Sequence, residues 1–390
     1  MRTLLIKNAK VVLPDLVELT NVLVDNGKIS AIGKIDSADE VIDANEGYLL
    51  AGFVDVHVHG GGGSDFMDST PDAFENAVKA HINHGTTTLV PTAMSATEED
   101  LKKFICNFKD FKMKNELSSV TPGIHIEGPY FSGANKKSVG AQPGNLLRLP
   151  DEAEMDRLLQ VAEGCILRWD ASPELEGSEM FARKCKKNGI ICSIAHSLAT
   201  SEQAQNGIDN GFSHVTHFYN AVTTYRKEGK DVLAGIVEAA YLNSEVKVEL
   251  ICDGKHIPKD ILRLALMIKG PEKVMAITDG MRISGTNMTS GKLGSLENGT
   301  DVIVDSDVAM LPDLSSYAGS IATMDRCFRV LVQDYGIDIV VASKMLSATP
   351  CSFLGIRNKG KIEVGMDADL VLFNNKLILN HTIINGSTIV

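Results

Sequence analysis

The chain has 390 residues, 44% of them hydrophobic, and a formal net charge of −12. This acidic balance, without a Lys/Arg cluster at either end, argues against a nucleic-acid or membrane surface, although one local arginine can still bind an anionic substrate. The sequence shows no run of 18 uncharged apolar residues and no cleavable leader. Seven scattered cysteines indicate buried thiols in a reducing compartment, so we expect a cytoplasmic protein.

Both ends of the chain read as antiparallel β structure. The first 50 residues alternate apolar and polar positions around a hairpin turn at Asp25-Asn26-Gly27-Lys28. Neither end is long enough to form a core alone, so residues 1–52 and 355–390 are expected to pair into one small β-sandwich domain. The expected strands are 3–6, 9–12, 20–25, 28–32, 40–43, 370–373, 378–380 and 382–390.

The central segment, residues 53–354, alternates strand and helix patterns. Eight strands in a segment of this length predict a (β/α)₈ TIM barrel, of mixed α/β class, in preference to a doubly wound sheet. The expected strands are 53–58, 86–91, 121–127, 165–171, 190–196, 213–217, 246–252 and 273–279. The expected helices are 71–84, 98–112, 151–162, 178–187, 201–210, 231–241 and 258–268, followed by a β excursion at 289–311 and helices near 320–335 and 338–347.

Four of these strands end in a residue that can bind a metal or move a proton. They deliver Glu127, His196, His217 and Asp279. Two imidazoles and one carboxylate suit a catalytic Zn²⁺ or similar ion with open positions for water, and the aspartate is left to take a proton from that water. Each residue alone fits a structural role equally well, such as a hydrogen-bonded core histidine. Because all four end barrel strands in chain order, a metal site is the better interpretation.

The first barrel strand carries two further histidines. His57 and His59 are two residues apart, so both side chains point to one face of the strand. They suit a second ion or an anchoring role at the same site. We therefore expect one or two divalent ions per subunit, zinc first, with iron, manganese or cobalt as alternatives.

Three other features suit substrate binding. His256, after the seventh strand, could polarise a carbonyl or bind a hydroxyl, and Arg226, in the loop after His217, could clamp a phosphate or carboxylate. Ala318-Gly319-Ser320 precedes an expected helix at 321–331, whose N-terminus would favour an anion. Each also has an ordinary reading as a solvated loop residue or turn.

Taken together, these motifs resemble the amidohydrolase superfamily and, within it, the N-acetylglucosamine-6-phosphate deacetylases, over almost the whole chain. The HxH pair is shared across the superfamily, whereas the segments around Glu127, His217 and His256 are more specific. The stretches that carry the resemblance are 52–60, 123–129, 195–197, 216–221, 253–256, 278–279 and 318–320.

The resemblance implies a function and a role for each residue. Glu127, His196 and His217 would bind the catalytic metal, Asp279 would be the acid/base, and His256, reaching across a dimer interface, would bind and polarise the substrate. Arg226 would hold the phosphate. The implied activity is hydrolysis of N-acetylglucosamine 6-phosphate to acetate and glucosamine 6-phosphate in amino-sugar catabolism, by a homodimer. The remaining implied substrate contacts are Ala141, Gln142, Asn220, Ala221, Tyr317, Ala318 and Gly319.

The chain departs from the family pattern after Arg226 and at Arg282, which adds a positive charge near the rim. These changes leave the sugar epimer and its phosphate open, so N-acetylgalactosamine 6-phosphate is an alternative substrate. A cyclic-amide hydrolase of the same superfamily is a second alternative, although Glu127 occupies the position where such enzymes often carry a carboxylated lysine. A catalytically dead sugar-binding barrel is a third, but such a protein would not need all four strand-end residues.

Overall fold

The computed structural model describes residues 3–133 and 136–390 of the chain. Its centre is a sheet of eight parallel strands in sequential order. The sheet closes on itself, because the Asp279 amide donates to the His57 carbonyl (3.0 Å) and the His59 amide to the Gly280 carbonyl (2.7 Å). The strands are β6 (Phe53–Val58), β9 (Thr86–Ala93), β10 (Ile124–Tyr130), β11 (Ile166–Ala171), β12 (Ile191–Ile194), β13 (Phe212–Val215), β16 (Lys247–Ile251) and β17 (Val274–Ile277).

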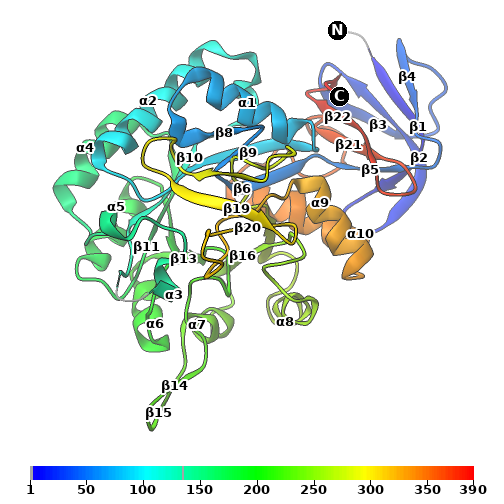
Figure 1. The fold of residues 1–390 in the computed structure, drawn as a ribbon. Coiled ribbons are helices and arrows are strands. Elements are labelled where there is room, and N and C mark those ends of the chain that lie inside the picture. Colours follow the sequence, from blue (N-terminus) through cyan, green and yellow to red (C-terminus); the bar gives the residue numbers. More distant parts are fainter. Residues whose placement is uncertain (1–2, 134–135) are drawn as a thin grey trace.

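Helices follow each strand and surround this barrel (Figure 1). Their apolar faces pack on the strands, as Phe74, Phe104 and Phe108 show in one buried cluster. The order predicted from the sequence is therefore confirmed. The helices are α1 (Pro71–Ile82), α2 (Glu98–Lys114), α3 (Lys136–Val139), α4 (Glu152–Ala162), α5 (Ser178–Lys187), α6 (Ser201–Asn210), α7 (Ile236–Leu242), α8 (Lys259–Lys269), α9 (Met324–Arg329), α10 (Ile339–Ser343) and α11 (Thr349–Phe353).

One sequence-based expectation for the helices is wrong in part, and another is confirmed with a shifted start. The helix expected at 231–241 is divided: β15 (Asp231–Leu233) pairs with β14 (Arg226–Glu228) in a hairpin, and α7 begins only after Gly235. The helix expected at 321–331 begins at Met324 and continues as a π-helical turn, η4 (Val330–Asp334). Ser320 instead bridges to Gly280 as extended backbone, so no helix N-terminus lies beside it.

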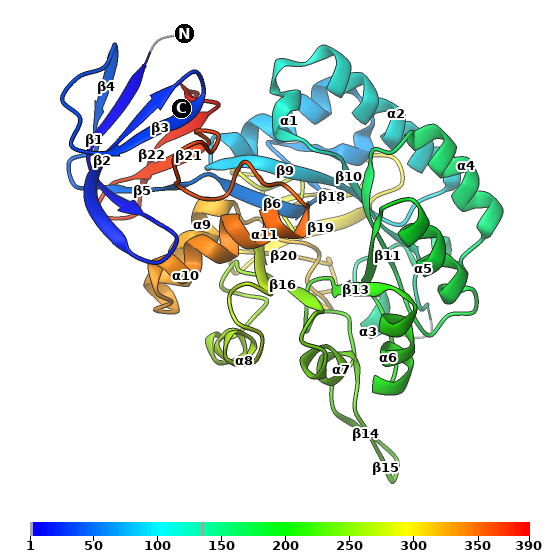
Figure 2. The same cartoon turned by 180° about the vertical axis from the view of Figure 1, so that it is seen from behind.

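The two ends of the chain form a second sheet beside the barrel (Figure 2). Strand β5 pairs with β1 on one side and with β21 on the other, which joins the N-terminal strands to the C-terminal ones. Hydrogen bonding makes this one continuous sheet; the division into two domains at residues 52 and 355 stays a prediction. Its strands are β1 (Leu4–Val12), β2 (Val17–Asp25), β3 (Lys28–Gly33), β4 (Glu40–Asp43), β5 (Tyr48–Ala51), β21 (Leu370–Phe373), β22 (Leu379–Ile384) and β23 (Ser387–Thr388).

A small antiparallel sheet crosses the mouth of the barrel (Figure 1). It consists of β18 (Ser290–Leu293), β19 (Thr300–Asp305) and β20 (Val308–Met310), and it confirms the β excursion expected at 289–311. Among the residues described, no helix is both long and apolar enough to cross a membrane. The remaining elements are β7 (Gly60–Gly61), β8 (Ser64–Asp65), η1 (Phe66–Asp68), η2 (Glu116–Val120), η3 (Gly144–Leu146) and η5 (Lys344–Ala348).

Candidate metal centre and active site

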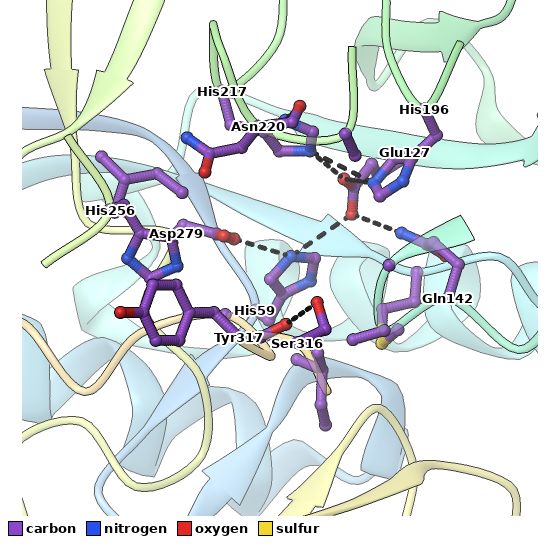
Figure 3. A pocket seen from close by; sticks show the side chains of 17 residues that line it. His59, Glu127, Gln142, His196, His217, Asn220, His256, Asp279, Ser316 and Tyr317 are labelled. Atoms are coloured by element: carbon purple, nitrogen blue, oxygen red, sulfur yellow. Dashed lines mark hydrogen bonds and ion pairs between the residues drawn. The ribbon is translucent and has the colours of Figure 1, made fainter. Parts of the chain in front are cut away.

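A pocket with about 640 Å³ of open space lies at the carboxyl ends of the barrel strands (Figure 3). Most residues predicted from the sequence to bind metal or substrate line it. These are His59, Glu127, Ala141, Gln142, His196, His217, Asn220, Ala221, His256, Asp279, Tyr317 and Gly319. This is the face on which barrel enzymes place their active sites.

The backbone turns sharply where three of these side chains enter the pocket. His196, His217 and Asp279 each lie two residues beyond the end of a barrel strand, and each has a positive φ, at 45°, 27° and 49°. A residue with a Cβ is strained in this left-handed region by roughly 1–3 kcal/mol. The strain is maintained by the surrounding hydrogen bonds, and it aims the three side chains inward.

Glu127, His196 and His217 form the first cluster. Glu127 Oε1 lies 3.0 Å from Nε2 of each histidine, and the two Nε2 atoms are 3.2 Å apart. Each ring has its Nδ1 against a backbone carbonyl, His196 on Ser138 (2.7 Å) and His217 on Asn220 (3.0 Å). Both rings therefore donate through Nδ1, which leaves two Nε2 lone pairs and one carboxylate oxygen facing one point. This donor set fits a divalent transition metal.

His57, His59 and Asp279 form the second cluster, directly beside the first. Nε2 of His59 lies 3.2 Å from Nε2 of His57 and 3.2 Å from Asp279 Oδ1. The other oxygen of Glu127, Oε2, is 3.4 Å from His59 Nε2, so Glu127 faces both clusters. His57 is fully buried beneath the pocket surface, whereas His59 and Asp279 line it. This set also fits a cation.

Electrostatics keep both carboxylates of the site ionised. Burial alone would raise the pKa of Glu127, but its close contacts with the imidazoles of His196 and His217 outweigh it and hold the pKa well below its ordinary value. Burial likewise opposes ionisation of Asp279, yet His57 and His59 hold its pKa below the ordinary value. Both groups are therefore charged at neutral pH, as metal binding and proton abstraction require.

Three polar side chains beside the clusters differ in how many of their hydrogen-bonding groups already have a partner. His256 donates through Nδ1 to Asp253 Oδ2 (2.8 Å), which fixes its ring in the pocket wall. Gln142 accepts from the Ser95 amide (3.0 Å) and donates to Glu127 Oε2 (2.9 Å), so it orients Glu127, and its contact with substrate stays a prediction. The side-chain amide nitrogen of Asn220 is buried and has no hydrogen-bond partner among the residues described, so it can bind an acceptor in the pocket.

The structure gives the positions of four residues for which the sequence raised expectations. Arg226 lies on the projecting β14–β15 hairpin, outside its own chain's pocket, with its Nε 2.7 Å from Glu228 Oε1 (Figure 1). Ala318 is buried behind Tyr317 and Gly319 and does not line the pocket. His256 lines the pocket of its own chain, and its reach across a dimer interface stays a prediction. Arg282 is buried and donates to both carboxylate oxygens of Asp68, so it adds no charge to the rim.

Several pocket residues were not singled out from the sequence. Met94 and Ile251 stand at the ends of strands β9 and β16, which is the signal that found the ligands, but their apolar side chains suggested only core packing. Leu293 reaches the pocket from the small sheet over the barrel mouth, and no local pattern predicts such a contact. Gly140 and Ser316 complete the wall.

A closed parallel barrel with two histidine–carboxylate clusters at its strand ends defines a metal-dependent enzyme. A model described as the amidohydrolase family matches residues 48–389. The chain belongs to the amidohydrolase family.

Named relatives narrow this class. The chain is 31% identical over 373 residues to the N-acetylglucosamine-6-phosphate deacetylase of Lysinibacillus sphaericus, covering 95% of this chain and 93% of the relative. It is 28% identical to the N-acetylgalactosamine-6-phosphate deacetylase of Escherichia coli O157:H7, covering 93% and 92%. A solved variant of the Mycobacterium smegmatis N-acetyl-D-glucosamine-6-phosphate deacetylase, in complex with N-acetyl-D-glucosamine-6-phosphate, superposes with a TM-score of 0.91 at 28% identity and covers 100% of both chains.

Proposed function

We propose that this protein is a metal-dependent deacetylase that hydrolyses N-acetylglucosamine 6-phosphate to glucosamine 6-phosphate and acetate. One observation carries the proposal: four strand ends bring Glu127, His196, His217 and Asp279 to one pocket, with the Glu127 oxygen 3.0 Å from both imidazole nitrogens. Relatives that match this chain over more than nine tenths of their length are named as deacetylases of acetylated amino-sugar phosphates.

The chain's own residues account for binding and proton transfer. Glu127, His196 and His217 would hold a divalent ion, which polarises the amide carbonyl and activates water when it is bound. Asp279 takes a proton from the attacking water as the oxygen–carbon bond forms, and it returns the proton to the amine nitrogen as the C–N bond breaks. His256, oriented by Asp253, binds a sugar hydroxyl or the carbonyl oxygen. We assign the second cluster to a second ion, and zinc to the first.

The phosphate site leads us to propose a homodimer. Among the residues whose side chains the structure describes, none that lines the pocket is a lysine or arginine, whereas a phosphate needs a cationic partner. Arg226 projects away on its hairpin, and its Nη1 is enclosed without a hydrogen-bond partner among the residues described. We therefore propose that Arg226 of a second copy of the chain supplies the cationic group of this pocket. The hairpin of each subunit would contribute its arginine to the pocket of the other subunit.

Three finer assignments complete the proposal. The terminal sheet encloses its own apolar cluster, which includes Leu4, Val22, Leu49 and Leu370, and this supports a separate small β-sandwich domain built from 1–52 and 355–390. All seven cysteines are free, which supports a reducing cytoplasm. The 28% identical N-acetylgalactosamine-6-phosphate deacetylase makes that sugar phosphate the second candidate substrate.

Acetate release tests the proposal directly. The purified protein, loaded in turn with Zn²⁺, Mn²⁺, Co²⁺ and Fe²⁺, should release acetate from N-acetylglucosamine 6-phosphate and much less from the unphosphorylated sugar. Faster turnover of N-acetylgalactosamine 6-phosphate would replace the substrate and keep the chemistry. If no acetylated sugar phosphate were hydrolysed with any of these ions, the proposal would be wrong.

A further inference from the structure

Beneath the pocket lies a group of charged side chains that the proposed reaction does not use. Arg168 on β11, Asp170 on the same strand and Glu249 on β16 are all fully buried, and none lines the pocket. Arg168 donates to both oxygens of Glu249, at 2.7 and 3.0 Å, and to Asp170 Oδ1 at 3.1 Å. Removing three charges from water is costly, and packing alone is often served as well by apolar residues of similar volume. The presence of these three buried charges is therefore not explained by packing alone.

Glu249 contacts both ligand clusters. Its Oε1 lies 2.8 Å from Nδ1 of His57 and accepts a hydrogen bond from the backbone amide of His217 at 3.1 Å. The first contact makes His57 donate through Nδ1, so the Nε2 lone pair faces His59 and Asp279. A carboxylate partner fixes the orientation of a histidine ligand and raises its basicity.

His57 differs in this respect from the other three histidines of the site. The rings of His196 and His217 are held by neutral backbone carbonyls, and Nδ1 of His59 has no partner among the residues described. Only in the second cluster does a buried carboxylate set the tautomer of a ligand. Arg168 in turn grips both oxygens of that carboxylate, which prevents it from rotating away.

We propose that Glu249 is a positioning residue that prepares His57 to bind a cation in the second cluster, with Arg168 holding Glu249 in place. This inference rests on the metal site of the proposed function and adds to it the residues that determine cation affinity. Without the Glu249 charge, the second cluster retains its three ligands, but the imidazole of His57 is no longer fixed in orientation and is less basic.

Cation affinity, not activity, is the readout that separates positioning from a merely structural role. Glu249→Gln keeps the size of the side chain and removes its charge. Asp170→Asn is the matched control: Asp170 is equally buried and also bonded to Arg168, but among the described residues its side chain bonds to His125 and Thr216 and to no side chain of either cluster. Stoichiometry and dissociation constants of Zn²⁺ and Co²⁺ would be measured by competition with a chelating dye, and the unfolding of each metal-free variant by circular dichroism.

We expect wild-type protein to bind two cations and Glu249→Gln to bind the weaker one roughly 10–100-fold less tightly. Asp170→Asn should change neither constant by more than about threefold, which is the scatter of such comparisons. If Glu249→Gln does not fold, Arg168→Lys, which can donate to only one oxygen of Glu249 at a time, should weaken the same cation several-fold.

Each other result overturns the inference. Equal affinities in wild type and Glu249→Gln, or equal losses in Glu249→Gln and Asp170→Asn, would leave Glu249 with a structural role only. A wild-type protein that binds one cation and hydrolyses substrate would reject the inference and keep the proposed function. A wild-type protein that binds no cation and hydrolyses nothing would reject both.

Discussion

The two ligand clusters share Glu127 but are held in different ways. In the first cluster, both histidines donate to backbone carbonyls, that of Ser138 on α3 and that of Asn220 in the loop after β13. In the second cluster, His57 depends on a side chain, Glu249, and Nδ1 of His59 has no partner among the described residues. Both rings of the first cluster are thus fixed, whereas in the second cluster only one of the two rings is. The first cluster should therefore bind its cation more tightly.

Asp279→Asn should have the largest effect on activity. Asparagine fits the same space and tolerates a left-handed backbone, but it cannot take a proton from water. We expect kcat to fall by about 10²–10⁴-fold, the usual contribution of a general acid–base group. The first cluster should keep its cation, as metal analysis would show. A variant with more than a tenth of wild-type kcat would contradict the role assigned to Asp279.

Substitution of one histidine in each cluster tests whether the first cluster binds its cation more tightly than the second. His196→Gln should remove the first cation and lower kcat/KM by about 10³-fold, corresponding to the several kcal/mol that a bound metal contributes. His59→Gln should remove only the weaker cation and leave the first in place. Metal content per subunit after dialysis distinguishes the two. If His59→Gln lost both ions and His196→Gln lost only one, the order of affinities would be reversed.

Substitution of Arg226 should affect substrate and leave both clusters intact. Its ion pair with Glu228 is partly exposed and therefore weak, so the guanidinium is free to bind a phosphate. Arg226→Ala should raise KM for the phosphorylated sugar about 10–100-fold, the value of a hydrogen bond to a charged group, with metal content unchanged. Lys227→Ala, on the same hairpin but exposed, is the control. An unchanged KM for Arg226→Ala would place the phosphate elsewhere.

The smallest expected effect is on the free energy of unfolding at acid pH, and it comes from His81, which contacts the backbone next to His59. His81 is fully buried, with Nε2 2.8 Å from the carbonyl of Gly60, and burial lowers its pKa from 6.5 to about 4. Because the unfolded chain binds this proton more readily, stability is complete above pH 6.5 and is lost as the pH falls toward 4. The loss is on the order of 3 kcal/mol for that shift.

His81→Gln, which can still donate to Gly60, should remove this part of the acid dependence. Urea unfolding of the metal-free protein at pH 7.5 and pH 5 would measure it. Equal pH dependence in wild type and His81→Gln would show that other groups cause the acid loss. His84→Gln, at a half-exposed histidine on the same helical end, provides a comparison.

The barrel and most of the site could be predicted from the sequence because apolar runs identify the strands, and the residues that follow these runs identify the site. Glu127, His196, His217 and Asp279 each follow an apolar run, and the parallel barrel then brings them together. The hairpin at 226–233 was missed because Val232 and Leu233 fit a helical pattern as well as a strand. The place of Arg226 depends on where that hairpin projects, which is a tertiary property.

Glu249 and Arg168 were missed for another reason. Each is a charged residue between apolar neighbours in a barrel strand, and this was a usable signal, because a buried charge needs a partner. The sequence alone does not show that the two partner each other, since their strands are separated in the barrel sheet by β12 and β13. Only the closed barrel brings Arg168 and Glu249 into contact beneath the pocket.

The left-handed backbone at His196, His217 and Asp279 has a consequence for engineering. At these three positions the backbone is strained because the residue carries a Cβ, and glycine would remove the strain. Variants selected only for a higher melting temperature should therefore accumulate glycine or asparagine at these positions and lose turnover. A thermostable form of this enzyme is better sought in the terminal sheet, where no residue contributes to the pocket.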